Sequence, residues 1–144
     1  MKYLKIQLLA LVMIILLTSC AKDQKVTVVK LGHSLDQSHS VHKAMVFMNK
    51  QLVEKSGGKM KIDIYPSGQL GNERELIELL QIGSLGMTKV SASPMESFVP
   101  EMKVFSLPYV FRSEEHLWRV LNSDIGKELL LSGQDYFLRG MCYY

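Results

Sequence analysis

The sequence has little cysteine, little net charge and no repeats, and each shortage excludes a class of protein. Two cysteines among 144 residues cannot build a disulfide-rich scaffold, so packing of apolar side chains must hold the fold together. Basic residues exceed acidic ones by only three, 17 against 14, and no basic stripe is present. This balance argues against nucleic acid as a partner.

Enzyme signatures are also missing from the sequence. It contains no His-Glu-x-x-His pair and no glycine-rich phosphate loop after the first predicted strand. Residues 32–36, Gly-His-Ser-Leu-Asp, resemble half of a nucleophile elbow, but Asp36 takes the place of the second glycine. We therefore expect no catalytic residue and no cofactor.

The N-terminal stretch is typical of a secretion signal. Two lysines precede an unbroken apolar run of ten residues, 8–17, which is too short to span a bilayer but suits a signal peptide. The next segment, Leu-Thr-Ser-Cys at residues 17–20, resembles the bacterial lipobox. This resemblance implies cleavage before Cys20 and a lipid anchor on Cys20, and hence a periplasmic or cell-envelope location. Ala21 is not the aspartate of an inner-membrane retention signal, so the choice of membrane stays open.

We divide the chain into a signal peptide at 1–19, a lipidated tether at 20–25 and an α/β lobe at 26–144. Removal of the signal takes away two lysines and lowers the formal charge from +3 to +1. If Cys20 carries lipid, Cys142 has no partner for an intramolecular disulfide.

Apolar periodicity and turn residues predict alternating strands and helices in the lobe. Asn72 with Glu75 forms a capping box, Gly83 ends that helix, and Ser40 and Ser113 are the expected caps of two others. An irregular stretch runs from residue 94 to 108. The predicted strands are 26–31, 60–65, 87–91 and 138–144, and the other predicted helices are 40–54, 114–121 and 124–131.

Strands that alternate with helices imply a parallel sheet covered on both faces, and therefore an α/β fold. The last predicted strand runs to Tyr144 without a polar tail. We therefore expect the sequence to be part of a longer protein.

Six short blocks follow one another in a specific order along residues 26–144. The most recognisable is Tyr-Pro-Ser-Gly-Gln-Leu-Gly-Asn-Glu-Arg-Glu-Leu at residues 65–76. The others are 55–62, 81–85, 100–101, 104–111 and 125–127. Together these blocks resemble the DctP-type solute-binding proteins of TRAP (tripartite ATP-independent periplasmic) transporters.

This resemblance implies a periplasmic-binding-protein-like (Venus-flytrap) fold, of which only the N-terminal part of the two-domain architecture is present. It also implies a receptor that binds a small carboxylated solute, a dicarboxylate or a sugar acid, and delivers it to the TRAP membrane permease. In the family an arginine binds the solute carboxylate, and its position lies beyond Tyr144. Two departures stand out: Gly86 replaces the usual aspartate, and Ser91 and Pro94 replace the Glu and Arg of sialic-acid-binding members. We therefore do not expect sialic acid as the solute.

The sequence also predicts a site without reference to a family, because ligands of open α/β sheets bind at the carboxyl ends of strands. The first strand ends at His33 and Ser34, and the third ends near Ser91 and Ser93. Turn capping is the competing interpretation for these residues. The remaining ligand candidates are His39, Glu73 and Arg74, and a solvated first helical turn is the competing interpretation for the last two.

Two other functions remain open. His33, His39 and His42 have a spacing that could bind zinc, although no cysteine or acidic cluster completes the site, so we predict no metal ligand. A metal-binding lipoprotein is nevertheless the alternative function. The third possibility is a lipid-tethered structural or interaction protein that binds no small ligand.

Overall fold

A computed structural model describes residues 25–144. The predicted signal peptide, Cys20 and nearly all of the tether lie outside the described residues. Three parallel strands form the centre of the described part, in the order β2-β1-β3. They are β1 (Thr27–Gly32), β2 (Met60–Tyr65) and β3 (Met87–Thr88). The predicted parallel sheet is thereby confirmed.

The register of the sheet determines which residues meet at its carboxyl edge. β1 pairs along its full length with β2, from Thr27 opposite Met60 to Gly32 opposite Tyr65. On its other side, Gly32 also pairs with Thr88 of β3. The residues that follow positions 32, 65 and 88 therefore leave the sheet side by side.

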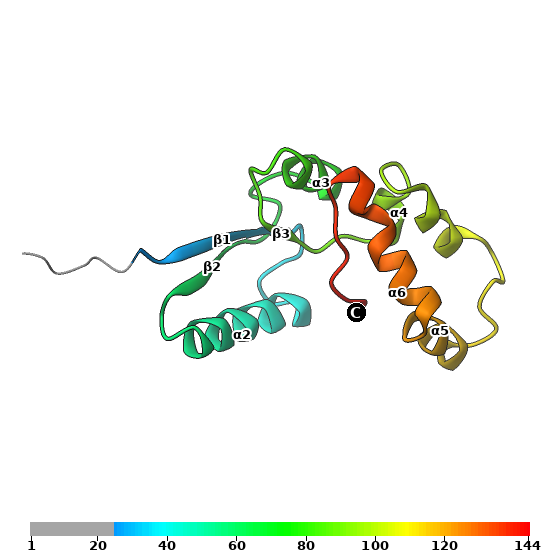
Figure 1. The fold of residues 1–144 in the computed structure, drawn as a ribbon, viewed down its shortest axis with the longest axis horizontal. Coiled ribbons are helices and arrows are strands. Elements are labelled where there is room, and N and C mark those ends of the chain that lie inside the picture. Colours follow the sequence, from blue (N-terminus) through cyan, green and yellow to red (C-terminus); the bar gives the residue numbers. More distant parts are fainter. Residues whose placement is uncertain (1–24) are drawn as a thin grey trace, which may run out of the picture.

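Helices cover both faces of this sheet (Figure 1). α2 (Ser40–Lys55) lies along one face and α3 (Glu73–Gln81) along the other. α2 contains no buried residue, and Phe47 on its outer side is 64% exposed. A side chain of α2 still fixes the sheet, because Asn49 Oδ1 accepts a 2.7 Å hydrogen bond from the backbone N–H of Ile62 in β2.

The start of α3 is set by its cap. Asn72 Oδ1 accepts hydrogen bonds from the backbone N–H groups of Arg74 and Glu75, and Glu75 Oε2 accepts one from Asn72 N–H. These reciprocal bonds satisfy amides that the first turn leaves unpaired. The predicted capping box is confirmed, and Gly83 follows the helix with a φ of +74°.

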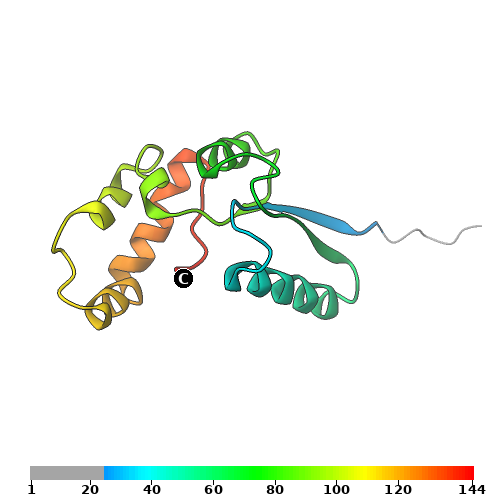
Figure 2. The ribbon, with the colours of Figure 1, turned by 180° about the vertical axis from the view of Figure 1, so that it is seen from behind.

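The remaining elements pack beyond the carboxyl ends of the strands, as both views show (Figures 1 and 2). Their apolar core unites Ile77 of α3 with Val99, Met102 and Leu138. Helices 114–121 and 124–131 have the bounds that the sequence predicts. The elements are α4 (Ala92–Met95), the 3-10 helix η1 (Pro100–Ser106), α5 (Glu114–Leu121), α6 (Asp124–Leu131) and the 3-10 helix η2 (Ser132–Tyr136).

Two local predictions are wrong at element ends. The cap of α2 is His39 rather than Ser40, because His39 Nδ1 accepts the hydrogen bond from Val41 N–H at 3.2 Å. β3 ends at Thr88 instead of continuing to residue 91, since β1 has no residue left to pair beyond Gly32. Ser91 therefore precedes α4 as its N-terminal boundary and is not part of a strand.

The predicted strand at residues 138–144 is also absent, and the segment has no regular structure. Instead it runs back beside α6, where Gly140 N–H donates to Leu130 O at 2.8 Å and Tyr143 OH donates to Gly126 O at 2.8 Å. Leu138 at its start is buried in the core with Ile77, Val99 and Met102, and Tyr143 is half-buried. Among residues 25–144 no helix is long and apolar enough to cross a membrane.

Replacement of Ile77 tests the core. Ile77 is fully buried, so we expect Ile77→Ala to lower the free energy of unfolding by about 2–5 kcal/mol, from lost burial plus the cavity left behind. Ile82→Ala is the matched control, because Ile82 follows the same helix and is 73% exposed, and it should cost less than about 0.5 kcal/mol. Urea unfolding of both variants measures the difference, and equal losses would contradict the assigned core.

Candidate functional site

The carboxyl edge of the sheet is held together at Gly32, where β1 meets both neighbours. Thr88 Oγ1 donates a 2.8 Å hydrogen bond to Gly32 O, and this bond closes the β1–β3 pair. A Cβ at position 32 would lie 2.7 Å from Cδ2 of Leu76, a side chain that is itself buried in the core. Glycine at this position therefore allows α3 to approach the strand end.

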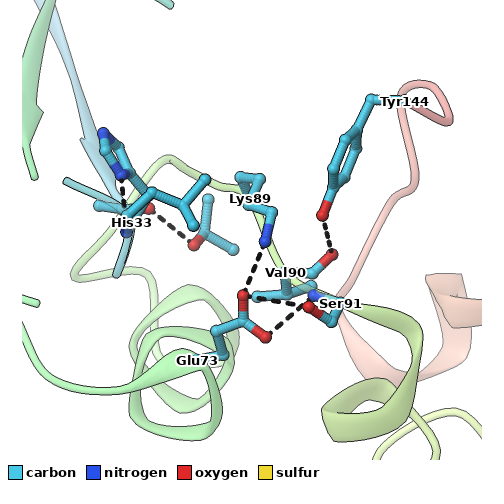
Figure 3. A network of polar contacts seen from close by, with 9 residues as sticks. His33, Glu73, Lys89, Val90, Ser91 and Tyr144 are labelled. Atoms are coloured by element: carbon cyan, nitrogen blue, oxygen red, sulfur yellow. Dashed lines mark hydrogen bonds and ion pairs between the residues drawn. The ribbon is translucent and has the colours of Figure 1, made fainter. Parts of the chain in front are cut away.

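An ion pair lies at this edge, between Glu73 in the first turn of α3 and Lys89 just after β3 (Figure 3). Lys89 Nζ and Glu73 Oε1 are 2.9 Å apart, and the two side chains are only 10% and 16% exposed. The Glu73 carboxylate also accepts hydrogen bonds from the backbone N–H and the hydroxyl of Ser91, at 3.0 and 3.4 Å. One carboxylate thus joins α3 to the segment that leads from β3 into α4.

These contacts keep Glu73 ionised. Burial raises the pKa of the Glu73 carboxyl, but the hydrogen bonds from Lys89 and Ser91 and the charge of Lys89 together lower it below its ordinary value of 4.5. The folded protein therefore binds fewer protons here than the unfolded chain does. The contribution to stability is present above pH 4.5 and is lost as the pH falls below it.

Tyr144 packs over the same lysine. Lys89 Nζ lies 5.2 Å from the centroid of the Tyr144 ring, within cation–π range, and Tyr144 OH donates to Val90 O at 3.4 Å. Figure 3 shows the ring approaching from the C-terminal segment, on the side of Lys89 away from β1. Lys89 Nζ donates to Glu73 Oε1 and also interacts with the Tyr144 side chain, and its three N–H groups leave capacity for a further acceptor.

His33, at the end of β1, is fully buried. Its Nδ1 accepts a hydrogen bond from Leu35 N–H at 3.2 Å, and its Nε2 lies 3.0 Å from Nδ1 of His42 in α2. Burial, followed by the charges of His42 and Lys89, lowers the pKa of His33 below its ordinary value of 6.5. The side chain therefore stays neutral at physiological pH.

The structure brings some of the predicted site residues together and separates others. His33, Glu73 and Ser91 lie around the carboxyl edge, with Ser34 exposed beside His33. Ser93 is exposed within α4, and its carbonyl accepts from Glu96 N–H. His39 faces solvent as the cap of α2. Arg74 points away along α3, paired with Glu78 at 3.3 Å and lying over the Phe98 ring.

Lys89 is the residue that sequence reasoning missed. Its signal was present but weak: a single basic residue within a short predicted strand, in a nearly neutral chain. The predicted strand extended to residue 91, and this placed Lys89 inside the sheet and hid its position at the edge. Its partner Glu73 is 16 positions earlier in the sequence, beyond the reach of a local pattern.

The three histidines do not form a metal site in the described part of the chain. His33 and His42 meet, but His39 uses its Nδ1 to cap α2. No group of three or more His, Cys, Asp or Glu side chains among residues 25–144 is placed to hold a metal ion. The zinc alternative thus gains no support from these residues.

The polar edge is an open wall and not an enclosed cavity. The two best-defined hollows of the described residues have volumes of about 690 and 480 Å³. One lies along α5 around Trp118, and the other lies beside α3 around Glu78 and Ile82. Neither includes a residue of the strand ends, so a solute at Lys89 would need a second wall.

A family model described as "Bacterial extracellular solute-binding protein, family 7" (DctP) matches residues 31–144. The chain belongs to this family. DctP proteins are solute-binding receptors, and this membership confirms the resemblance that the six sequence blocks indicate.

Three relatives place the chain within the DctP family. The uncharacterised protein YiiZ of Salmonella typhimurium is 46% identical over 97 residues, which cover 67% of this chain and 29% of YiiZ. The C4-dicarboxylate-binding protein DctB of Bacillus subtilis is 38% identical over 91 residues, which cover 63% of this chain and 26% of DctB. A crystal structure of a TRAP periplasmic solute-binding protein from Bradyrhizobium, in complex with galacturonate, matches with a TM-score of 0.76 and 38% identity.

The match to the Bradyrhizobium structure covers 81% of this chain and 39% of that one. The fold is therefore the α/β fold of TRAP periplasmic binding proteins, as the sequence predicts. This chain spans less than two fifths of the length of each of these three relatives.

Replacement of Glu73 tests the ion pair at the edge. We expect Glu73→Gln to lower the free energy of unfolding at pH 7 by about 1–3 kcal/mol, because a charged hydrogen-bond acceptor for Lys89 and Ser91 is lost. The difference from wild type should shrink as the pH falls below 4.5, where the wild-type carboxylate takes up a proton. Urea unfolding at several pH values measures both effects.

Glu78→Gln is the matched control on the same helix. Glu78 pairs with Arg74 in solvent, where both side chains are more than half exposed, so the change should cost less than about 0.5 kcal/mol. A loss at Glu78 as large as that at Glu73 would contradict the special role of the Glu73–Lys89 pair.

Proposed function

We propose that this chain forms one wall of the solute-binding cleft of a TRAP receptor, and that the receptor binds a small organic acid and delivers it to the TRAP membrane permease without catalysing a reaction. The observation that carries the proposal is Lys89: an ammonium on a side chain that is only 10% exposed, at the carboxyl edge of a parallel sheet, in a chain of the DctP family. Open α/β sheets bind their ligands at this edge.

The chemistry of the edge suits a carboxylated, hydroxylated solute. Lys89 supplies positive charge with unused N–H groups, and Ser34 and Ser91 supply hydroxyls nearby. A sugar acid uses both kinds of group, whereas a C4-dicarboxylate mainly uses the charge. Among solved structures, the galacturonate-bound relative is 38% identical and covers 81% of the chain, against 29% and 77% for a succinate-bound one, so we put a sugar acid first.

The rest of the proposal follows the division of the sequence. Residues 1–19 serve as a signal peptide, Cys20 carries the lipid anchor, residues 20–25 form the tether and residues 26–144 form the first lobe. The mature receptor is then held at a membrane in the periplasm or cell envelope. A carboxylate-binding arginine and a second lobe lie after Tyr144 in the complete protein.

The proposal predicts a ligand response that depends on the carboxylate. Galacturonate at about one hundred times its Kd should stabilise the full-length protein by about 2.7 kcal/mol, measured as a rise in Tm. Galactose, which has the same ring without the carboxylate, should produce no rise. Succinate tests the hypothesis that the solute is a dicarboxylate, and zinc chloride tests the hypothesis that the protein binds a metal. A rise with zinc and none with any organic acid would overturn the proposal.

Replacement of Lys89 tests its role in solute binding. Lys89→Gln should weaken sugar-acid binding by about tenfold or more in isothermal titration calorimetry, because a charge-assisted hydrogen bond is worth about 1.5–3 kcal/mol. The control is Lys127→Gln, which removes an equal charge from an exposed pair with Asp124 on α6. Unchanged affinity in Lys89→Gln, or the same loss in both variants, would remove Lys89 from the site.

A further inference from the structure

The contact between His33 and His42 restricts where hydrogens can lie. Leu35 N–H already donates to Nδ1 of His33, so that nitrogen carries no hydrogen. The other nitrogen of His33 faces Nδ1 of His42 at 3.0 Å, and one hydrogen must lie between them. A neutral His33 has that hydrogen on its own Nε2, so His33 donates and His42 accepts. In this arrangement the His33 ring is neutral.

A further proton cannot enter the pair without breaking a contact. On His33 it would go to Nδ1 and face the N–H of Leu35. On His42 it would go to Nδ1 and face the N–H of His33. Either position places two N–H donors opposite each other and leaves a polar group without an acceptor beside the buried His33 ring.

The surrounding charges act on this pair from each element packed against it. Lys89 follows β3 and His39 caps α2, and both oppose positive charge on His33. The neighbouring carboxylate is Asp36, in the loop between β1 and α2, which interacts with the His42 charge and not directly with His33. Asp36 faces solvent, so it is screened and does not neutralise the buried ring.

The pair joins two parts of the fold at the proposed site. On one side, the backbone of His33 is tied to β2 and the following turn, through Tyr65 O at 3.0 Å and Gly68 N–H at 3.1 Å. On the other side, its ring holds the first turn of α2 through His42. The loop at residues 33–39, which carries Ser34, is therefore closed at both ends by His33 and α2.

We propose that His42 is a positioning residue, which holds His33 and the 33–39 loop against the carboxyl edge of the sheet and releases them when the pair takes up a proton. The effect on stability depends only on this geometry. The effect on solute affinity rests on the proposed function, because it requires the 33–39 loop to contact the solute.

The sign of the pH dependence follows from the neutral His33. An unfolded His33 takes up a proton near pH 6.5, whereas the buried His33 resists it, so its contribution to stability is complete above pH 6.5 and declines as the pH falls below it. The Glu73 carboxylate loses its contribution only below pH 4.5. The Tm of the full-length protein should therefore fall between pH 7.5 and 5.0.

The matched variants are His42→Asn and His116→Asn. Asparagine at 42 retains an acceptor for His33 Nε2–H but removes the His42 charge, the second cause of the lowered His33 pKa, so the fall in Tm between pH 7.5 and 5.0 should shrink. His116 lies on α5 and is not among the groups that lower the His33 pKa, so His116→Asn should leave the fall in Tm unchanged. An unchanged fall in His42→Asn, or an equal reduction in both variants, would overturn the proposal.

A second measurement needs no variant. Imidazole ¹⁵N spectra of the wild-type protein should show His33 as the Nε2–H tautomer, with its signals unchanged from pH 7.5 to about 6. An Nδ1–H tautomer of His33 would contradict the proposed arrangement of the pair. Failure of every organic acid to bind would refute the proposed function, while the Tm and ¹⁵N results would still decide the role of His42.

If an organic acid binds, the pH dependence of its Kd tests whether the histidine pair affects the solute site. The Kd of the wild-type protein should rise between pH 7.5 and 5.0, by at most about tenfold per pH unit for one linked proton. In His42→Asn this rise should be smaller, and in His116→Asn it should match wild type. A wild-type Kd that is independent of pH would confine the pair to stability and refute its role in solute binding.

Discussion

The double pairing of β1 is the constraint on which the rest of the structure depends. Because Gly32 pairs with Tyr65 on one side and Thr88 on the other, three chain segments must leave the sheet at the same edge. Every polar contact of the candidate site starts within a few residues of these positions or reaches them from a neighbouring helix. Glu73 reaches them because α3 packs closely against Gly32, where the chain has no side chain to hold the helix away.

Gly86 extends this pairing by one contact. Its N–H donates to Lys30 O at 3.0 Å, and a Cβ at this position would lie 2.9 Å from Cγ1 of Val29. The glycine that replaces the usual aspartate of the DctP family therefore lets the short β3 lie directly against β1. Since β3 has only two residues, this contact and the Thr88 hydroxyl account for much of what holds it in place.

The elements that could be predicted from the sequence are those whose signals are local. The alternation at 60–65 gives a strand with those bounds, and the Asn72–Glu75 cap gives the start of α3. Helix 114–121 likewise follows from its Ser113 cap, and helix 124–131 from the Gly133 that closes it. In each case the stabilising contacts lie within one or two turns of the residues that signal them, so no knowledge of the fold is needed.

The features that the sequence did not yield depend on distant partners. The apolar residues at 138–144 would also suit a strand. Gly140 and Tyr143 instead make hydrogen bonds with α6, so the segment packs there. His39 displaces Ser40 as a cap through a ring nitrogen, which is a less common cap than a hydroxyl. The roles of Lys89 and His42 come from Glu73 and His33, which a pattern of spacing cannot place.

The charge balance at the edge bears on how the solute can be held. Lys89 is the cation of this edge, but Glu73 already neutralises it at 2.9 Å, and the pair is shielded from water. An approaching carboxylate therefore meets an ammonium whose field is partly cancelled, together with a second carboxylate that repels it. The neutral His33 ring beside it adds no charge. The edge can orient an acid through its hydroxyls and the remaining Lys89 N–H groups, yet it has too little net positive charge to hold the acid tightly. The physical requirement for tight binding is a further cation from the opposite wall of the cleft, and this is the role that the family resemblance gives to an arginine after Tyr144.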